Sequence, residues 1–246
     1  MRIALFLLVL CAALDAAAGQ CRAESGPQTM ALVELYTSQG CSSCPPAERW
    51  LSGLKSPHVV PIALHVDYWD YIGWKDPYAK REFSLRQRKL TQLQRRALVY
   101  TPQVMLQGRD FRGWDTPAFE AAVARISARP AAAHIALELA GVEGAGLRVR
   151  VAAQAPQRPA AALYLAAYEN RLESRVTAGE NRGRTLRQDY VVLEWQGPLG
   201  LGAAARPEER LLPLLPGAVP TNSGVAAFVQ DRRTGEVLQA LMLPAC

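Results

Sequence analysis

A chain of 246 residues that is 50% hydrophobic and 20% charged has the composition of a globular protein, not of a disordered or fibrous one. Its 28 basic and 22 acidic residues give a net charge of +6, which is mild, and no base-reading motif accompanies it. We therefore read the charge as a solubility feature and expect no nucleic-acid partner.

The first 18 residues have the layout of a secretory signal peptide. Arg2 supplies the positive charge, residues 3–14 are mostly apolar, and Ala16–Ala18 offers a cleavage site. An apolar stretch of about twelve residues is too short to cross a bilayer comfortably, so we expect a periplasmic or secreted protein with no stable membrane insertion after cleavage. A core-forming first helix is one alternative. A lipoprotein signal at Cys21 is another, although the residue before it is not a small one.

Removal of this leader takes Cys11 away and leaves Cys21, Cys41, Cys44 and Cys246. An even number of cysteines in an oxidising compartment allows two bridges. Cys41 and Cys44 are neighbours in the sequence, so the remaining bridge would join Cys21 to Cys246 and tie the two ends of the mature chain together. Unpaired thiols or an intermolecular bridge are the alternatives.

Residues 30–129 alternate between the periods of strands and helices. Gly53 and Pro57 end the first helical pattern, a turn at Gln107–Arg109 indicates a hairpin, and Thr116 caps the last helix. The expected elements, in chain order, are a strand at 30–37, a helix from Pro45, a strand at 59–66, an aromatic segment at 67–74, a helix at 77–98, strands at 103–106 and 110–113, and a helix after Thr116 that ends before Pro130.

From His134 onward the helical period disappears, and short alternating runs are separated by turn residues. These runs, with Arg233–Gly235 as the best hairpin signal, predict an antiparallel sandwich-like β domain at 131–246, with a boundary near Arg129–Pro130. The polar segment GENRGRTLRQDY, residues 179–190, either grips a partner or the first domain, or is a solvated loop. The expected strands lie at 135–139, 147–151, 162–168, 190–195, 225–230 and 237–242.

The order strand, helix, strand, helix, strand, strand, helix is that of a minimal thioredoxin fold, with Cys-x-x-Cys at the first strand–helix junction. The segment VELYTSQGCSSCPPAERWL resembles the glutaredoxin and thioredoxin active-site segment, and YTPQVMLQGRDFRGW resembles the segment that carries their cis-proline. Together with VDYWDYIGW and GENRGRTL, these segments are similar to a family of exported bacterial thioredoxin-like proteins of unassigned function. The resemblance covers nearly the whole mature chain. It implies a thioredoxin-like domain at 28–130, with Pro102 as the cis-proline and Thr101 against the sulfurs.

The spacing of Cys41 and Cys44 suits thiol–disulfide exchange. A thiolate attacks disulfides, and a helix N-terminus lowers the pKa of a cysteine, so Cys41 is predicted to attack. Two intervening residues bring Cys44 within range to resolve the mixed disulfide. Pro45–Pro46 is unusual after the motif, because a helix that begins near Cys44 exerts a weaker dipole on Cys41.

Glu34 and His65 are further candidates. Glu34 matches the buried acid of the thioredoxin segment, which implies a proton acceptor for Cys44, and an edge-facing or salt-bridged glutamate is the alternative. A single Cys-x-x-Cys supplies two of the roughly four ligands of a closed metal site. Metal handling with help from His65 is therefore an alternative, as is a purely structural Cys41–Cys44 bridge, and no cofactor is expected.

The sequence thus predicts an exported thiol–disulfide oxidoreductase that acts on protein or peptide thiols, with a redox partner that it does not name. The runner-up is a non-catalytic envelope binding module on a thioredoxin-like scaffold, followed by a copper- or metal-handling protein. Fold does not decide between these functions. The exposure of the Cys41 sulfur and its thiolate character distinguish them.

Overall fold

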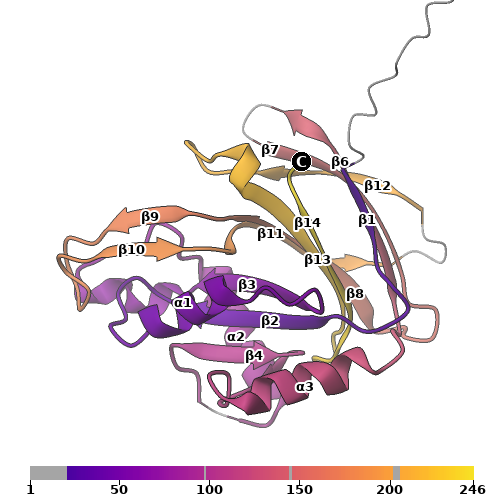
Figure 1. The fold of residues 1–246 in the computed structure, drawn as a ribbon, viewed down its shortest axis with the longest axis horizontal. Helices are drawn as coiled ribbons and strands as arrows, with labels where there is room; N and C mark the ends of the chain where they lie inside the picture. Colours follow the sequence, from indigo (N-terminus) through magenta and orange to yellow (C-terminus); the bar gives the residue numbers. More distant parts are fainter. Residues whose placement is uncertain (1–20, 97, 144–145, 202–205) are drawn as a thin grey trace, which may run out of the picture.

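The computed structural model describes residues 21–96, 98–143, 146–201 and 206–246. It is a mixed α/β protein that consists mostly of sheet (Figure 1). The expected signal peptide, residues 1–18, lies outside the described residues. Nowhere in the described ranges is there a helix long and apolar enough to cross a membrane.

The main sheet runs through both halves of the chain. Its strands are β2 (Ala31–Thr37), β3 (Val59–His65), β4 (Gln103–Leu106), β5 (Arg109–Asp110), β8 (Ala161–Glu169), β11 (Val191–Gly200), β13 (Ser223–Asp231) and β14 (Val237–Pro244). Within the described residues these eight strands lie in the order β14-β13-β8-β11-β3-β2-β4-β5.

Two smaller sheets complete the β structure of the described residues. The first has the order β1-β6-β7-β12 and consists of β1 (Arg22–Glu24), β6 (His134–Glu143), β7 (Gly146–Gln154) and β12 (Glu208–Pro213). The second is a two-stranded ribbon of β9 (Leu172–Arg175) and β10 (Thr185–Gln188), which extends over α1 (Pro45–Gly53) (Figure 1).

The other helices are α2 (Arg81–Leu93), α3 (Pro117–Ser127) and the 3₁₀ turns η1 (Asp67–Ile72) and η2 (Pro220–Asn222). The α2 helix is shorter than the expected helix at 77–98. Lys80 has an extended backbone, and Arg95 has a φ of 55°, which a continuing right-handed helix does not allow. The Thr116 hydroxyl accepts a hydrogen bond from the Ala118 amide, as expected of a cap.

The strand β2 lies between two apolar layers. Because successive side chains of a strand point to opposite faces, Val33 and Leu35 pack with α1 and α3, whereas Leu32 and Tyr36 pack with α2. β3 runs parallel to β2 on one side, and β4 runs antiparallel to it on the other. This arrangement brings the ends of β2 and β3 and the start of β4 to one edge of the molecule.

The sheet does not stop where the sequence pattern changes. β11 lies beside β3, with Val191 opposite Ala63, and the Ala63 amide donates to the Tyr190 carbonyl at 2.8 Å. β8, β13 and β14 then extend the same sheet. The expected division into 28–130 and 131–246 therefore separates two sequence patterns that share one sheet, because β3 would otherwise present an unpaired edge.

The sheet β1-β6-β7-β12 packs over the part of the main sheet that the second half contributes. Ile135, Leu137 and Val149 from the smaller sheet share a core with Leu165 and Val225 from the main sheet. The other face of this part of the main sheet packs against α2. A sandwich-like packing is thus present, but one of its two sheets belongs to both halves of the chain.

The expected bridge between Cys21 and Cys246 is confirmed, with a Cα–Cα distance of 5.7 Å. β1, which follows Cys21, pairs antiparallel with β6, and the Leu139 amide donates to the Cys21 carbonyl at 2.7 Å. The bridge therefore fastens β1 to the end of β14.

Candidate active site

The Cys41–Cys44 disulfide lies in the turn between β2 and α1, with a Cα–Cα distance of 5.5 Å. The Cys41 amide donates to the Ser38 carbonyl at 3.1 Å, and the Cys44 carbonyl accepts from the amides of Ala47 and Glu48. Cys44 is thus the cap of α1, and the two prolines after it occupy the first helical positions, where they are tolerated. The partial positive charge of the helix lies closest to Cys44, with Cys41 three residues further out.

The disulfide is closed off from solvent. Cys41 and Cys44 are both 0% exposed, although the serines between them are exposed. The loop 176–184, which joins β9 to β10, lies against the backbone of this turn, where Asn181 Nδ2 donates to the carbonyl oxygens of Gln39 at 2.9 Å and Cys41 at 2.8 Å. A segment 140 residues away in the chain therefore binds the backbone of the cysteine turn.

The Thr101–Pro102 bond is cis, as predicted. Tyr36 of β2 is opposite Gln103 of β4, so the preceding Thr101–Pro102 segment lies beside the end of β2. Trp69 connects this segment to the cysteine turn: its Nε1 donates to the Thr101 hydroxyl at 2.7 Å, and its Cβ lies 3.4 Å from where a Cβ on Gly40 would stand. The structure thus brings Thr101–Pro102 and the cysteine turn together around one tryptophan.

Glu34 lies on the face of β2 that packs against α2, opposite the face that packs against α1. Its Oε1 accepts a hydrogen bond from Arg86 Nε at 2.6 Å and from the Tyr36 hydroxyl at 3.1 Å. Glu34 is therefore a salt-bridged glutamate, the alternative that the sequence left open. The structure does not bring it together with Cys44.

A second buried glutamate, Glu48, lies on the cysteine side of the sheet. Helical side chains four residues apart share a face and lean toward the helix N-terminus, so Glu48 leans toward the turn that holds Cys44. Its carboxylate accepts hydrogen bonds from the Thr37 hydroxyl at 2.6 Å and from Gln188 Nε2 at 2.9 Å. Burial raises the pKa of Glu48, and the nearby His65 and these two hydrogen bonds only partly offset the rise.

A buried histidine–aspartate pair adjoins Glu48. His65 Nδ1 lies 2.7 Å from Asp76 Oδ2, which also accepts the Gln39 amide at 2.8 Å. Burial acts to lower the pKa of His65, but Asp76 and Glu48 outweigh it, so the pKa is raised. Burial acts to raise the pKa of Asp76, but His65 together with the amides of Gln39 and Tyr78 outweighs it, so that pKa is lowered. Glu48, His65 and Asp76 therefore form a buried cluster in which the pKa values of Glu48 and His65 are raised and that of Asp76 is lowered.

The described part of the chain offers no set of ligands for the metal-handling alternative. No group of three or more His, Cys, Asp and Glu side chains is arranged there to hold a metal ion. His65 is paired with Asp76, and Cys41 is bonded to Cys44.

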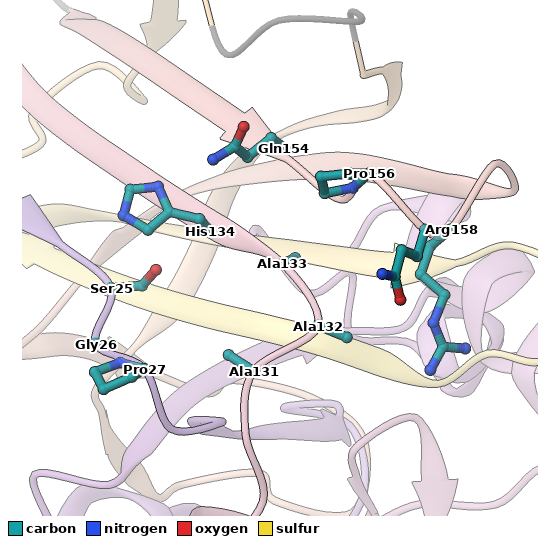
Figure 2. A pocket seen from close by; sticks show the side chains of 11 residues that line it. Ser25, Gly26, Pro27, Ala131, Ala132, Ala133, His134, Gln154, Pro156 and Arg158 are labelled. Atoms are coloured by element: carbon teal, nitrogen blue, oxygen red, sulfur yellow. The ribbon is translucent and has the colours of Figure 1, made fainter.

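A separate hollow of about 630 Å³ lies between the segment before β2 and the start of β6 (Figure 2). Two basic side chains line it, and both already have carboxylate partners: His134 is 3.0 Å from Glu24, and Arg158 is 3.6 Å from Glu236. None of the residues that line it belongs to the cysteine turn, to Thr101–Pro102 or to the loop 176–184. The hollow is therefore distinct from the candidate active site.

Sequence reasoning missed Glu48, Asn181 and the pairing of His65 with Asp76. Glu48 had a signal, because an acid four residues after Cys44 shares its helix face. Asn181 had a weaker one, because it lies in the polar GENRGRTL segment. No local pattern connects Asp76 to His65, since the contact depends on how the chain folds back after η1.

Two solved structures and one family model are similar to this chain. Protein AGR_C_4864 from Agrobacterium tumefaciens matches with a TM-score of 0.67 at 25% sequence identity, over 90% of this chain and 97% of that one. A domain of the outer membrane lipoprotein Omp28 from Porphyromonas gingivalis matches with a TM-score of 0.31 at 15% identity, over 46% of this chain and 88% of that one. No curated protein is similar enough to count as a match. The model of DUF1223, a family of proteins of unknown function, matches residues 32–230, which hold the cysteine turn, Thr101–Pro102 and the loop 176–184, and the chain belongs to this family.

Proposed function

We propose that this protein is an exported thiol–disulfide oxidoreductase that acts on protein or peptide thiols through Cys41 and Cys44. The observation that carries the proposal is the place of their disulfide, between the end of β2 and the first residue of α1. A helix N-terminus favours the thiolate form of a nearby cysteine, and the thiolate is the species that attacks disulfides.

A thioredoxin-like arrangement of residues 31–127 supports this proposal. The elements follow the order β2, α1, β3, α2, β4, β5, α3, with β3 parallel and β4 antiparallel to β2. Thr101–Pro102 immediately precedes β4, where thioredoxin-like folds carry their cis-proline. We assign this interval to a thioredoxin-like unit whose sheet is extended by β11, β8, β13 and β14.

The exchange proceeds in two displacements. In the reduced protein the Cys41 thiolate attacks a substrate disulfide, forms a mixed disulfide and releases one substrate thiolate. Cys44 then loses its proton and attacks the Cys41 sulfur, which releases the second substrate thiolate and leaves the Cys41–Cys44 disulfide. The reverse sequence oxidises a substrate dithiol, and a separate redox protein restores the starting state in either direction.

Glu48 is the acid that we assign to the proton of Cys44, in place of Glu34. It lies on the same helix face as Cys44, it is buried, and burial raises its pKa toward that of a thiol. The adjoining His65–Asp76 pair supplies a second place for the proton. The Thr101 hydroxyl accepts a hydrogen bond from Trp69, which lies beside Gly40 of the cysteine turn, and we assign Thr101 to substrate positioning.

Export to the periplasm or out of the cell fits the two disulfides. Structural disulfides persist in oxidising compartments, and Cys21–Cys246 is one that has no place in the proposed cycle. The leader-like residues 1–18 are consistent with the same route. The proposed partners are protein or peptide thiols and disulfides, and the cycle requires no cofactor.

The test compares Cys41→Ser with Cys44→Ser, both reduced and presented with a disulfide-bonded protein. Cys44→Ser retains the attacking thiolate and lacks the resolving one, so it should accumulate a mixed disulfide visible by non-reducing electrophoresis. Cys41→Ser should form none, and both variants should lose turnover. A Cys21→Ser/Cys246→Ser double variant should keep its turnover. Turnover retained by Cys41→Ser, or a mixed disulfide formed equally by both single variants, would contradict the assignment.

A second candidate function, a non-catalytic binding module, is favoured by one observation: both cysteines are 0% exposed. A protein whose Cys41–Cys44 bridge is only structural should resist reduction by thioredoxin-type dithiols while folded. Titration of the native protein against glutathione separates the two functions. A redox-active pair equilibrates within the range of known oxidoreductases, whereas structural disulfides lie below about −300 mV.

A further inference from the structure

The loop 176–184 is fastened to the cysteine turn by side chains rather than by strand pairing. Asn181 is fully buried, and its Nδ2 donates to the carbonyl oxygens of Gln39 and Cys41. Its Oδ1 accepts from Arg184 Nη1 at 3.0 Å, which fixes the orientation of the amide. Nothing in a two-stranded ribbon requires such contacts, so they need another explanation.

The residues next to Asn181 in the loop also contact the cysteine turn and its surroundings. The Glu180 carboxylate accepts the Ser42 amide at 2.9 Å, and this bond lowers the pKa of Glu180. Gly179 lies against η1: a Cβ there would stand 3.1 Å from Ile72 and 3.3 Å from Trp74. The tip of the loop, residues 179–181, therefore contacts both the cysteine turn and the aromatic segment beside it.

The base of the ribbon is anchored independently of its tip. Gln188 of β10 donates to Glu48 and accepts from Gln39 Nε2, which also donates to the Ser174 hydroxyl of β9 at 2.9 Å. The strands can therefore stay in place while the tip moves. The tip is held to the cysteine turn by three hydrogen bonds, two from Asn181 and one to Glu180.

Resting on the oxidoreductase function proposed above, we propose that the loop 176–184 is a lid over the Cys41–Cys44 site, which an extended polypeptide substrate opens by taking over the backbone groups that Glu180 and Asn181 now hold. The exposed groups would be two acceptors, the carbonyls of Gln39 and Cys41, and one donor, the Ser42 amide.

An extended peptide backbone offers N–H donors and a C=O acceptor within a few residues, which matches this set of groups. A small thiol without amide groups offers neither, so the class of substrate that the lid selects is the polypeptide. A small reductant must instead wait for the lid to open by itself, and its rate reports the population of the open form.

The first experiment measures how fast a phosphine reductant cleaves Cys41–Cys44 in the native oxidised protein, with alkylation and peptide mapping to locate the thiols. Asn181→Ala removes the two hydrogen bonds that hold the loop to the cysteine turn, each with a net contribution of about 1 kcal/mol, so reduction should accelerate about tenfold to thirtyfold. Arg182→Ala, an exposed residue of the same loop, is the matched control and should keep the wild-type rate.

Asn181→Asp is the second variant, because it keeps the size of the side chain while the ionised carboxylate cannot donate. It should show the same acceleration at neutral pH, and thermal melting verifies that each variant is folded. Wild-type reduction rates in both folded Asn181 variants would overturn the lid.

The second experiment tests the polypeptide. Reduced Cys44→Ser protein reacts with a ten-residue peptide whose single cysteine carries a thionitrobenzoate group. The Cys41 thiolate attacks the peptide sulfur, the S–S bond breaks, and the released thionitrobenzoate is measured by its absorbance. N-methylation of the amides next to the peptide cysteine removes the donors, and should slow this step at least tenfold in Cys44→Ser but little in Cys44→Ser/Asn181→Ala. Equal rates for the two peptides in Cys44→Ser would overturn the polypeptide as the opening ligand.

Failure of the lid and failure of the function give different results. If the Asn181 variants are reduced faster but no form of the protein turns over a disulfide-bonded protein substrate, the lid stands and the oxidoreductase function falls. If wild type turns over substrate while the Asn181 variants are reduced at its rate, the function stands and the lid falls.

Discussion

Glu34 and Glu48 are both buried, and their partners decide what each can do. Glu34 is hydrogen-bonded to a guanidinium, so its charge is matched within the core. Glu48 accepts hydrogen bonds from the neutral donors Thr37 and Gln188, and burial raises its pKa although the nearby His65 partly offsets the rise. A carboxyl of the second kind can take up and return a proton, whereas one of the first kind is engaged in its ion pair.

This difference predicts the effect of Glu48→Gln on the second displacement. If Glu48 accepts the proton of Cys44, the variant should resolve mixed disulfides about a hundredfold more slowly at neutral pH. The loss should shrink as pH rises and Cys44 ionises without help. Stopped-flow measurement of mixed-disulfide decay across pH checks this. A loss independent of pH would show a structural role instead, and Glu34→Gln serves as the control that leaves the pH profile unchanged.

Asp76 predicts a stability change with pH. Its folded-state pKa is lowered, so its contribution is present above the unfolded value of about 3.9 and is lost as pH falls through the folded pKa. Asp76→Asn should therefore be destabilised by about 3–5 kcal/mol at neutral pH, since it leaves buried His65 without its carboxylate. The deficit should narrow below about pH 3.9. Urea midpoints from pH 3 to 7 measure it, and a constant deficit over that range would contradict the assignment.

Between elements, Arg86 is the main polar connection from α2 to the second half of the chain. Its guanidinium lies over the rings of Tyr164, Trp195 and Phe228, at 4.9 to 5.1 Å from their centroids. These rings come from β8, β11 and β13, and Glu34 of β2 binds the same guanidinium. One side chain thus joins four strands of the shared sheet to one helix.

Removal of this cation alone should be costly. Arg86→Met leaves Glu34 buried without a counter-charge, so the free energy of unfolding should fall by about 3–5 kcal/mol. The double variant Glu34→Gln/Arg86→Met should recover most of that loss, and Lys89→Met, on the exposed surface of α2, should change it by less than about 0.5 kcal/mol. Denaturant unfolding of wild type, Glu34→Gln, Arg86→Met and their double variant provides the double-mutant cycle, and strictly additive losses would contradict the coupling.

The sequence predicted those elements whose apolar residues recur at the spacing of a helix or a strand, because that spacing is a local property of the chain. β2, β3, α1 and α3 each carry a buried stripe, and the runs of the second half became strands for the same reason. β1, β9, β10 and β12 were missed because they are short and largely polar. The parallel pairing of β11 with β3 was also missed, since a buried strand does not encode its neighbour. The same limit applies to the site: the cysteines and Thr101–Pro102 lie in recognisable segments, whereas Asn181 reaches them only through the fold.

For the molecule as a whole, the shared sheet and the Cys21–Cys246 bridge oppose separation of the two halves. β11 lies between β3 and β8, so the first half cannot detach without breaking the main sheet. The bridge spans 225 residues and restrains almost the entire described chain in its unfolded state.

Loss of this bridge should lower stability through the unfolded state. On the chain-entropy model, a bridge that closes a loop of 225 residues raises the free energy of unfolding by at most about 5 kcal/mol. Cys21→Ser/Cys246→Ser should therefore unfold at lower denaturant in a single transition, because the shared sheet stays intact. Chemical denaturation followed by tryptophan fluorescence and circular dichroism checks both parts. Two separate transitions would contradict the continuity of the sheet.

The same bridge imposes an order on the making of the protein. Synthesis runs from Cys21 toward Cys246, so the Cys21 thiol exists, along with Cys41 and Cys44, well before its partner is added 225 residues later. A chain interrupted anywhere in that interval keeps Cys21 as a thiol or pairs it wrongly with the cysteine turn. The closed bridge therefore shows that the whole chain from Cys21 to Cys246 was made, and peptide mapping of the unreduced protein would tell molecules that carry the bridge from interrupted ones.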